Sequence, residues 1–179
     1  TAGDSTDLYY VDTEMYDTPE YGSIYILDAE RPALVDTGIG LRYEAILDGM
    51  AEVGIAPEDL EVIAPTHVHL DHAGGAGHLA RHCPNAEVVV HERGAEYLTD
   101  ADRLDRLMRS VSKAQGIEDP FGQPELVPEG RVRTVSGGET LDLGDRSLDI
   151  YDAPGHAPHP FVCFAEDDGP LYAGDACGD

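Results

Sequence analysis

A dense run of histidine and aspartate residues directly after a short apolar strand is the feature that most constrains the fold of this chain. The segment PTHVHLDHAGG (65–75) places three histidines and one aspartate within six positions. The apolar run LEVIAPTH (60–67) leads into it and predicts a strand, so the polar residues begin where that strand ends. Because α/β proteins place their chemistry in loops at strand ends, the sequence predicts a functional loop here.

The residue types in this run indicate metal binding. Imidazole and carboxylate groups are suitable ligands for zinc and other divalent metals. Side chains at i and i+2 of an extended segment point the same way, so His67 and His69 can share one ion. If the chain turns just beyond them, Asp71 and His72 face a second ion, and the glycines at 74–75 would allow such a turn. The run therefore looks like a partial ligand set for two ions, to be completed from distant sequence.

Two distant segments supply further candidates. DAPGHAPH (152–159) places His156 in a Pro/Gly turn after a predicted strand, and LYAGDACGD (171–179) places Asp175 in a glycine-flanked turn. A lone histidine or aspartate in a turn is more often solvated or bonded to the backbone. These two residues are therefore candidate metal ligands only in combination with the histidine-rich run. His159 is a candidate for lining the pocket.

The periodicity of apolar residues predicts strands with interspersed helices and therefore an α/β class with mixed sheets. Asp100 and Gly116 are the expected N-cap and stop signal of the longest helix. The predicted elements are a hairpin over 22–28 and 32–38, strands at 60–67 and 86–92, helices at 41–54, 74–83 and 100–116, a loop over 119–130, and several strands between 131 and 175.

The charge of the chain is strongly acidic and is spread over its whole length. Thirty-six Asp and Glu residues oppose eleven Lys and Arg residues, which gives a formal net charge of −25. A dispersed acidic coat repels itself at low salt and is screened at high salt. We interpret it as a halophilic adaptation to a salty cytoplasm rather than as an ordinary acidic composition. Nucleic acid and anionic membranes are expected to be poor partners.

Sequence features related to location agree with a cytoplasmic protein. No apolar run reaches the ~20 residues needed to span a bilayer. The N-terminal TAGDSTDLYY lacks the basic-then-apolar layout of a secretory signal. Cys83, Cys163 and Cys177 are odd in number and widely spaced, which argues against a disulfide framework and against a cysteine-rich zinc site.

The ordered motifs resemble those of the metallo-β-lactamase fold superfamily. They are H-x-H-x-D-H at 67–72, a histidine after Pro-Gly at 156, an aspartate after glycine at 175, and LVDTG at 34–38. The resemblance covers nearly the whole chain and implies an α/β fold, an αββα sandwich of two mixed β-sheets flanked by helices. It also implies one metal held by His67, His69 and His156, a second held by Asp71, His72 and a bridging Asp175, and an Asp36 that orients a ligand.

One departure from the family pattern concerns the second metal. The family has a further histidine late in the second half of the fold, and this chain ends at Asp179 before such a residue. We therefore expect residues 1–179 to form one domain of this fold that lacks its C-terminal part.

Three functional hypotheses follow from this ligand pattern. The first is a hydrolase of a small ester, thioester, lactone or related substrate that uses one or two zinc ions, with iron or manganese as alternative metals. In it, a bound Zn²⁺ lowers the pKa of water to about 7, which makes hydroxide available as the nucleophile at neutral pH. Asp71 ligates the second ion and orients this nucleophile. The second is a mononuclear iron persulfide dioxygenase-like enzyme, and the third is a non-catalytic metal-binding module. The expected partner is a small molecule, and the oligomeric state stays open.

Overall fold

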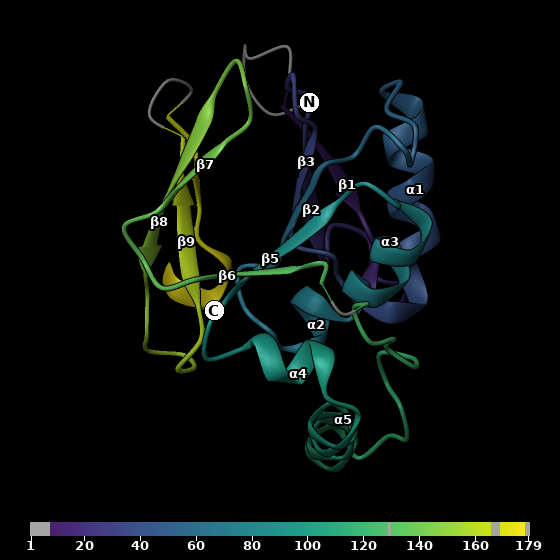
Figure 1. Cartoon of the computed structure of the whole chain (residues 1–179). Coiled ribbons are helices and arrows are strands. Elements are labelled where there is room, and N and C mark those ends of the chain that lie inside the picture. Colours follow the sequence, from purple (N-terminus) through teal and green to yellow (C-terminus); the bar gives the residue numbers. More distant parts are fainter. Residues whose placement is uncertain (1–7, 129, 166–168, 178–179) are drawn as a thin grey trace.

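Two β-sheets stacked face to face form the centre of the molecule (Figure 1). The computed structural model describes residues 8–128, 130–165 and 169–177. The first sheet has the strand order β1-β2-β3-β4-β5-β6, and the second has the order β10-β9-β8-β7. The strands are β1 (Leu8–Asp12), β2 (Ser23–Leu27), β3 (Ala33–Val35), β4 (Val62–Ala64), β5 (Glu87–His91), β6 (Val132–Val135), β7 (Thr140–Asp142), β8 (Ser147–Asp152), β9 (Phe161–Phe164) and β10 (Leu171–Tyr172).

The direction of the strands differs between the two sheets. In the first sheet β1, β2 and β3 are antiparallel, and β3 to β6 run parallel, so this sheet is mixed as expected. In the second sheet every described pair is antiparallel. The predicted hairpin is confirmed as β2 and β3, in which Tyr25 pairs with Val35.

The four helices between residues 43 and 99 contribute to the core on the face of the first sheet that points away from the second one, whereas the longest helix lies at the bottom of Figure 1 and packs in a separate cluster with Met15 and Phe121. Over the described residues, no helix covers the outer face of the four-stranded sheet. None of the described helices is both long and apolar enough to cross a membrane. The helices are α1 (Tyr43–Glu52), α2 (Leu70–Ala73), α3 (Ala76–His82), α4 (Ala95–Thr99) and α5 (Ala101–Gln115), with short 3₁₀ turns η1 (Met15–Asp17), η2 (Gly40–Arg42) and η3 (Gly174–Cys177).

The central strands are buried on both faces, which explains their unbroken apolar sequences. In β4, Val62 and Ala64 belong to the core between the sheets, whereas Ile63 belongs to the core under the helices. The same alternation places Val89 of β5 between the sheets and Val88 under the helices. Successive side chains of a strand point to opposite faces, so a strand between two layers must be apolar throughout.

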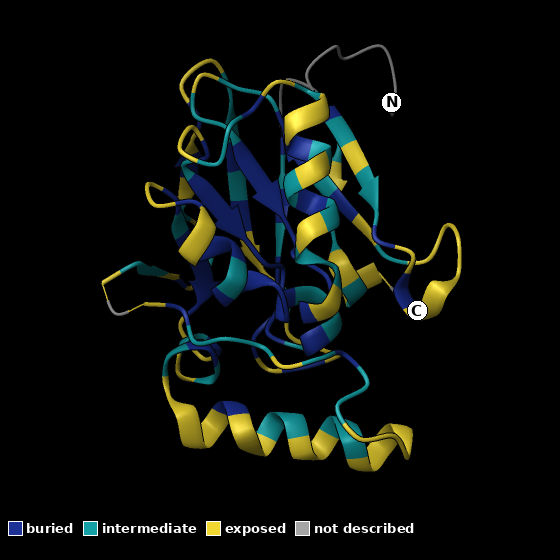
Figure 2. Ribbon diagram, turned by 90° about the vertical axis from the view of Figure 1, so that its right-hand side faces the viewer, coloured by how far each residue is buried: buried dark blue, intermediate teal, exposed yellow. Residues whose placement is uncertain are grey.

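The predicted boundaries of helix α5 are confirmed. The Asp100 carboxylate accepts a hydrogen bond from the Arg103 N–H at 2.9 Å, and Gly116 ends the helix with a φ of +69°. Leu104 turns inward and packs with Met15 and Phe121. The remaining surface of α5, the long helix at the bottom of Figure 2, is largely exposed.

Besides the 3₁₀ turns, two helices and one strand were not predicted, and each is short or weakly apolar. Helix α2 covers only four residues inside the histidine-rich run, and α4 covers only five. Strand β1 lies at the edge of the first sheet, and Leu8 is its single buried residue. The helix expected at 74–83 begins at Ala76, after a separate turn of α2.

Candidate metal centre

The site lies at one edge of the sandwich, where both sheets contribute loops. Strands β3 and β4 are parallel neighbours, so the residues after them, Asp36 and His67, emerge at the same edge. His156 comes from the loop between β8 and β9, and Asp175 comes from η3, directly after β10. The two sheets therefore bring together residues that are far apart along the chain.

Three imidazole rings form the first convergent group. Nδ1 of His69 lies 3.1 Å from Nε2 of His67 and 2.9 Å from Nε2 of His156. Ligands about 2.0–2.1 Å from one tetrahedral zinc ion are separated by roughly 3.3 Å, so the three nitrogens are spaced as a single cation requires. His69 and His156 could thus hold a metal ion together with the fully buried His67.

His72 and Asp175 form a second group with His67. Nε2 of His72 lies 3.1 Å from Oδ1 of Asp175. The other oxygen, Oδ2, lies 3.4 Å from Nε2 of His156 and 3.9 Å from Nε2 of His67. Asp175 thus presents one carboxylate oxygen to each group, the arrangement that a bridging ligand needs.

Asp36 fixes the orientation of His72 from beneath the site. Oδ2 of Asp36 lies 2.9 Å from Nδ1 of His72, which leaves Nε2 of that ring facing Asp175. Oδ1 accepts hydrogen bonds from the backbone N–H of Thr66 at 2.7 Å and from its hydroxyl at 2.8 Å. Asp36 is 5% exposed and has a φ of +65°. A strained backbone conformation persists where the surroundings fix it, here by three hydrogen bonds at a candidate functional site.

Asp71 is the one predicted ligand outside both groups. It belongs to α2 and lines a cavity of about 560 Å³ together with His72, His156 and Asp175. Neither compact group of ligand atoms includes its carboxylate. Asp71 is thus close enough to act in the cavity, and its role as a ligand remains a prediction.

Burial and neighbouring charges give the histidines opposite proton affinities. Burial, followed by the nearby imidazoles of His72, His69 and His156, lowers the pKa of His67 to about 2. Burial also lowers the pKa of His72, but its hydrogen bond to Asp36 and the surrounding carboxylates outweigh burial and raise it to about 9. Neutral imidazole is the form that binds metal, so His67 is ready for coordination at neutral pH, whereas His72 must release a proton.

His159 lies beside the first group but is not part of it. Its ring centroid lies 5.4 Å from that of His69 and 6.1 Å from that of His67. It is 6% exposed, and its Nδ1 accepts a hydrogen bond from the Val68 N–H at 3.5 Å. Burial, followed by the neighbouring imidazoles, lowers the pKa of His159 to about 4, so it is neutral beside the site.

The glycines behind the histidine-rich run act differently from the prediction. Gly74 and Gly75 have ordinary negative φ angles of −62° and −83°, so no special turn is made there. Instead, a Cβ on Gly75 would lie 2.4 Å from the backbone oxygen of Thr37. The residues are glycines because the loop after β3 packs directly against them.

Thr66 is a site residue that the sequence analysis missed. Its two hydrogen bonds to Asp36 join the loop after β3 to the loop after β4. Its position directly before His67 was the available signal. Of the two cysteines nearest to the site in sequence, Cys163 is buried and Cys177 is exposed.

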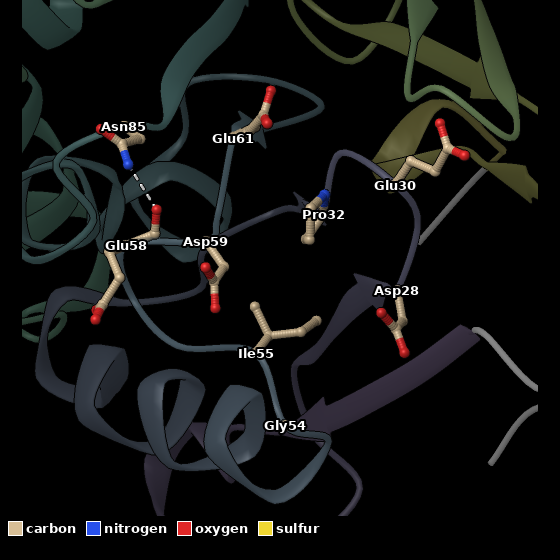
Figure 3. Close-up of a pocket in the computed structure, with 9 residues that line it drawn as sticks. All are labelled: Asp28, Glu30, Pro32, Gly54, Ile55, Glu58, Asp59, Glu61 and Asn85. Carbon is tan, nitrogen blue, oxygen red and sulfur yellow. Dashed lines mark hydrogen bonds between the residues drawn. The ribbon is translucent and has the colours of Figure 1, made fainter.

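A slightly larger cavity lies at the opposite end of the first sheet and contains none of these histidines (Figure 3). Its volume is about 600 Å³, and it lies beside Pro32 and Glu61, where β3 and β4 begin. Ligands of parallel sheets bind at the carboxyl ends of strands, so we place the candidate site at the histidine groups. The lining carboxylates of this second cavity are Asp28, Glu30, Glu58, Asp59 and Glu61.

Comparisons with known proteins agree with the motif pattern and with the fold. The family model of the metallo-beta-lactamase superfamily matches residues 17–178. The metallo-beta-lactamase fold-containing protein ST1585 of Sulfurisphaera tokodaii is 28% identical over 89% of this chain and 58% of its own length. Its crystal structure matches 90% of this chain and 60% of that chain with a TM-score of 0.75. A B3 metallo-beta-lactamase with an active-site glutamic acid gives a TM-score of 0.66 at 28% identity, over 89% of this chain and 54% of that one.

An enzyme with a named substrate class is also similar to this chain. The acyl-coenzyme A thioesterase MBLAC2 of Bos taurus is 28% identical over 96% of this chain and 64% of its own length. This chain therefore spans about three fifths of the length of these curated relatives.

Proposed function

This chain belongs to the metallo-beta-lactamase superfamily, and on that premise we propose that it is a metal-dependent hydrolase of a small ester, thioester or lactone. The observation that carries the proposal is the convergence of two ligand groups on one carboxylate, Asp175, at the wall of a cavity. A group that served only to hold the fold together would have no need of an adjoining cavity of about 560 Å³.

We assign the first metal position to His67, His69 and His156, and the second to His72, Asp71 and the bridging Asp175. Zinc is the proposed metal, because nitrogen-rich ligand sets of this kind suit it. When bound, such a cation supplies a polarising charge for the substrate oxygen and lowers the pKa of a coordinated water to about 7.

The side chains of this chain have separate tasks in the proposed reaction. Asp36 holds the ring of His72 so that its Nε2 faces the cavity. Asp71, at the cavity wall, orients the attacking water and accepts its proton. His159 keeps bulk water away from the first group, because its buried ring covers one side of His69. For a thioester, water adds to the carbonyl carbon, the C–S bond breaks, and a carboxylic acid and a thiol are released.

Thioesters are the favoured substrates among these classes. The similarity to an acyl-coenzyme A thioesterase extends over 96% of this chain. A ribonuclease of Thermus thermophilus is 33% identical over 86% of the chain, but it is matched over only 35% of its own length. A net charge of −25 repels a polyanionic nucleic acid, which favours the small substrate.

Metal analysis and a substrate panel test the proposal together. The purified protein is expected to contain zinc and to hydrolyse at least one of a set of chromogenic esters, thioesters and lactones, with loss of turnover after chelation. His69→Ala is expected to abolish the chelator-sensitive turnover. His82→Ala is the matched control, because this exposed histidine lies outside both groups.

Other outcomes discriminate among the alternatives. Iron in place of zinc, with oxygen uptake in the presence of a persulfide, would favour the dioxygenase. Full metal occupancy with no turnover on any substrate of the panel would favour a binding module. Unchanged turnover in His69→Ala would rule out the assigned ligand set.

A further inference from the structure

Helix α5 concentrates positive charge in an otherwise acidic chain. It carries Arg103, Arg106, Arg109 and Lys113, which are four of the eleven basic residues. Their spacing of three, three and four residues places them on one side of the helix. The inward side is apolar and packs through Leu104, so the basic side faces outward.

A cavity adjoins this basic side. It has a volume of about 240 Å³ and is formed between α4 and α5. Two arginines, two hydroxyl-bearing side chains and one apolar side chain make up its wall. They are Arg103, Arg106, Tyr97, Ser110 and Leu107.

The two arginines of the cavity differ in their partners. Arg103 pairs with Glu96 at 2.7 Å, and its guanidinium carbon lies 5.9 Å from the centre of the Tyr97 ring. Within the part of the chain that the structure describes, the Arg106 side chain makes no ion pair, although thirty-six acidic residues are present in the chain. Arg109, on the same helix but outside the cavity wall, pairs with Asp105 at 2.6 Å. Arg106 is thus the positive group that is left for a ligand.

Packed aromatic rings separate this cavity from the first ligand group of the metal centre. Tyr97, which lines the cavity, has its ring centroid 5.9 Å from that of His159. His159 in turn lies 5.4 Å from His69 of the first ligand group. The rings of Tyr97 and His159 thus form a continuous row between the wall of this cavity and the first ligand group.

We propose that the cavity between α4 and α5 binds an anionic group, a phosphate or a carboxylate, at the leaving-group end of the substrate. The planar guanidinium presents paired N–H donors that match both anions, and the hydroxyls of Ser110 and Tyr97 add two further donors. The acidic remainder of the surface repels anions, so an anionic substrate is held at this basic helix rather than elsewhere. Participation in turnover rests on the proposed hydrolase function, whereas anion binding does not.

A series of thioesters with one acyl group and different thiols tests the proposal. Coenzyme A carries phosphates, glutathione carries carboxylates, and N-acetylcysteamine carries neither. Arg106→Gln is expected to raise KM about tenfold for a thioester with an anionic thiol, to leave kcat nearly unchanged, and to leave the N-acetylcysteamine thioester unaffected. Arg109→Gln is the matched control and is expected to behave as the wild type. The thiol that shows the arginine dependence identifies the anion as phosphate or carboxylate.

An equal rise of KM for all three thioesters, or no rise for any of them, would overturn the proposal. Direct binding separates its failure from failure of the hydrolase function. Calorimetry at low salt is expected to detect adenosine 3′,5′-bisphosphate or glutathione binding to the protein as purified, with about tenfold weaker binding in Arg106→Gln. Binding without hydrolysis would retain the anion cavity and reject the hydrolase, whereas absence of binding of both probes would reject the cavity whether or not thioesters are hydrolysed.

Discussion

At the scale of single residues, Asp36 joins a strained backbone to the chemistry of the site. Its carboxylate accepts two hydrogen bonds from Thr66 and lies 2.9 Å from Nδ1 of His72. Residues that orient metal ligands in this way contribute to metal affinity although they never touch the ion. Its left-handed backbone, with a φ of +65°, is tolerated because the buried hydrogen bonds fix it.

Replacing Asp36 with Asn tests this role without changing the shape of the side chain. Asn also tolerates a left-handed backbone, so the fold should persist. The variant is expected to hold the His72 ring less firmly and so to weaken metal binding about 10- to 100-fold, measured by competition with a chromophoric chelator. The loss of the negative charge also lowers the pKa of His72, which eases release of its proton but does not restore the orientation of the ring. Asp119→Asn is the control, because Asp119 also has a positive φ but lies outside both ligand groups. Equal metal affinity of the two variants would contradict the assigned role.

Gly75 gives a prediction about stability. A methyl group at this position would meet the Thr37 backbone oxygen at 2.4 Å, and a backbone atom cannot move aside easily. Gly75→Ala is expected to lower the free energy of unfolding by about 1–3 kcal/mol in urea titrations. Gly155→Ala, where a Cβ meets nothing within 4 Å, should change it by less than about 0.5 kcal/mol. A Gly75→Ala protein as stable as the control would show that the two loops are not packed as described.

At the scale of elements, the loop between β8 and β9 carries His156 and is fastened at both ends. Oδ1 of Asp152 lies 3.1 Å from Nε2 of the buried His91 at the end of β5. Arg93 donates a hydrogen bond to the backbone oxygen of Pro158 at 2.9 Å and lies 3.7 Å from Asp152. These contacts tie a loop of the second sheet to a strand end of the first.

Removing the Arg93 side chain should loosen this loop more than it affects the fold. Arg93→Ala is expected to weaken metal binding about tenfold, because His156 is then held less firmly, while the melting temperature changes little. Arg133→Ala is the matched control, since Arg133 forms a comparable partly exposed pair with Glu87 on the neighbouring strands. A large drop in melting temperature with unchanged metal affinity would instead indicate a purely structural role for Arg93.

At the scale of the whole molecule, the dominant quantity is the net charge of −25. Salt weakens the repulsion between carboxylates, because the Debye length falls from ≈ 10 Å at 0.1 M to 3 Å at 1 M ionic strength. The described ion pairs are mostly partly exposed, as in Arg31–Glu61, and contribute little to stability individually. This balance supports the proposal of a protein adapted to a salty cytoplasm.

Salt titration tests this proposal. Raising KCl from 0.1 M to 2 M at neutral pH is expected to raise the melting temperature, because screening relieves repulsion among the carboxylates. The same titration near the isoelectric point of about 4.3 is the control, since the net charge there is small and the salt increment should shrink. A melting temperature that falls with KCl at neutral pH would reject the halophilic interpretation.

Features encoded within a few neighbouring residues were determined by the sequence alone. The apolar strands β4 and β5, the capped helix α5 and the ligand types of the histidine-rich run depend on local periodicity, capping and side-chain chemistry. The fold class and the family also followed, because the order of the motifs is specific.

Only the tertiary structure decided which groups meet, because convergence depends on how distant elements pack. His69 and His156 are 87 positions apart, and their ring nitrogens come to 2.9 Å only after the two sheets stack. The same packing places Asp71 at the cavity wall and the arginines of α5 beside Tyr97. It also leaves no room for a Cβ atom at Gly75. Local sequence specifies side-chain chemistry, whereas contacts between elements specify the distances on which that chemistry depends.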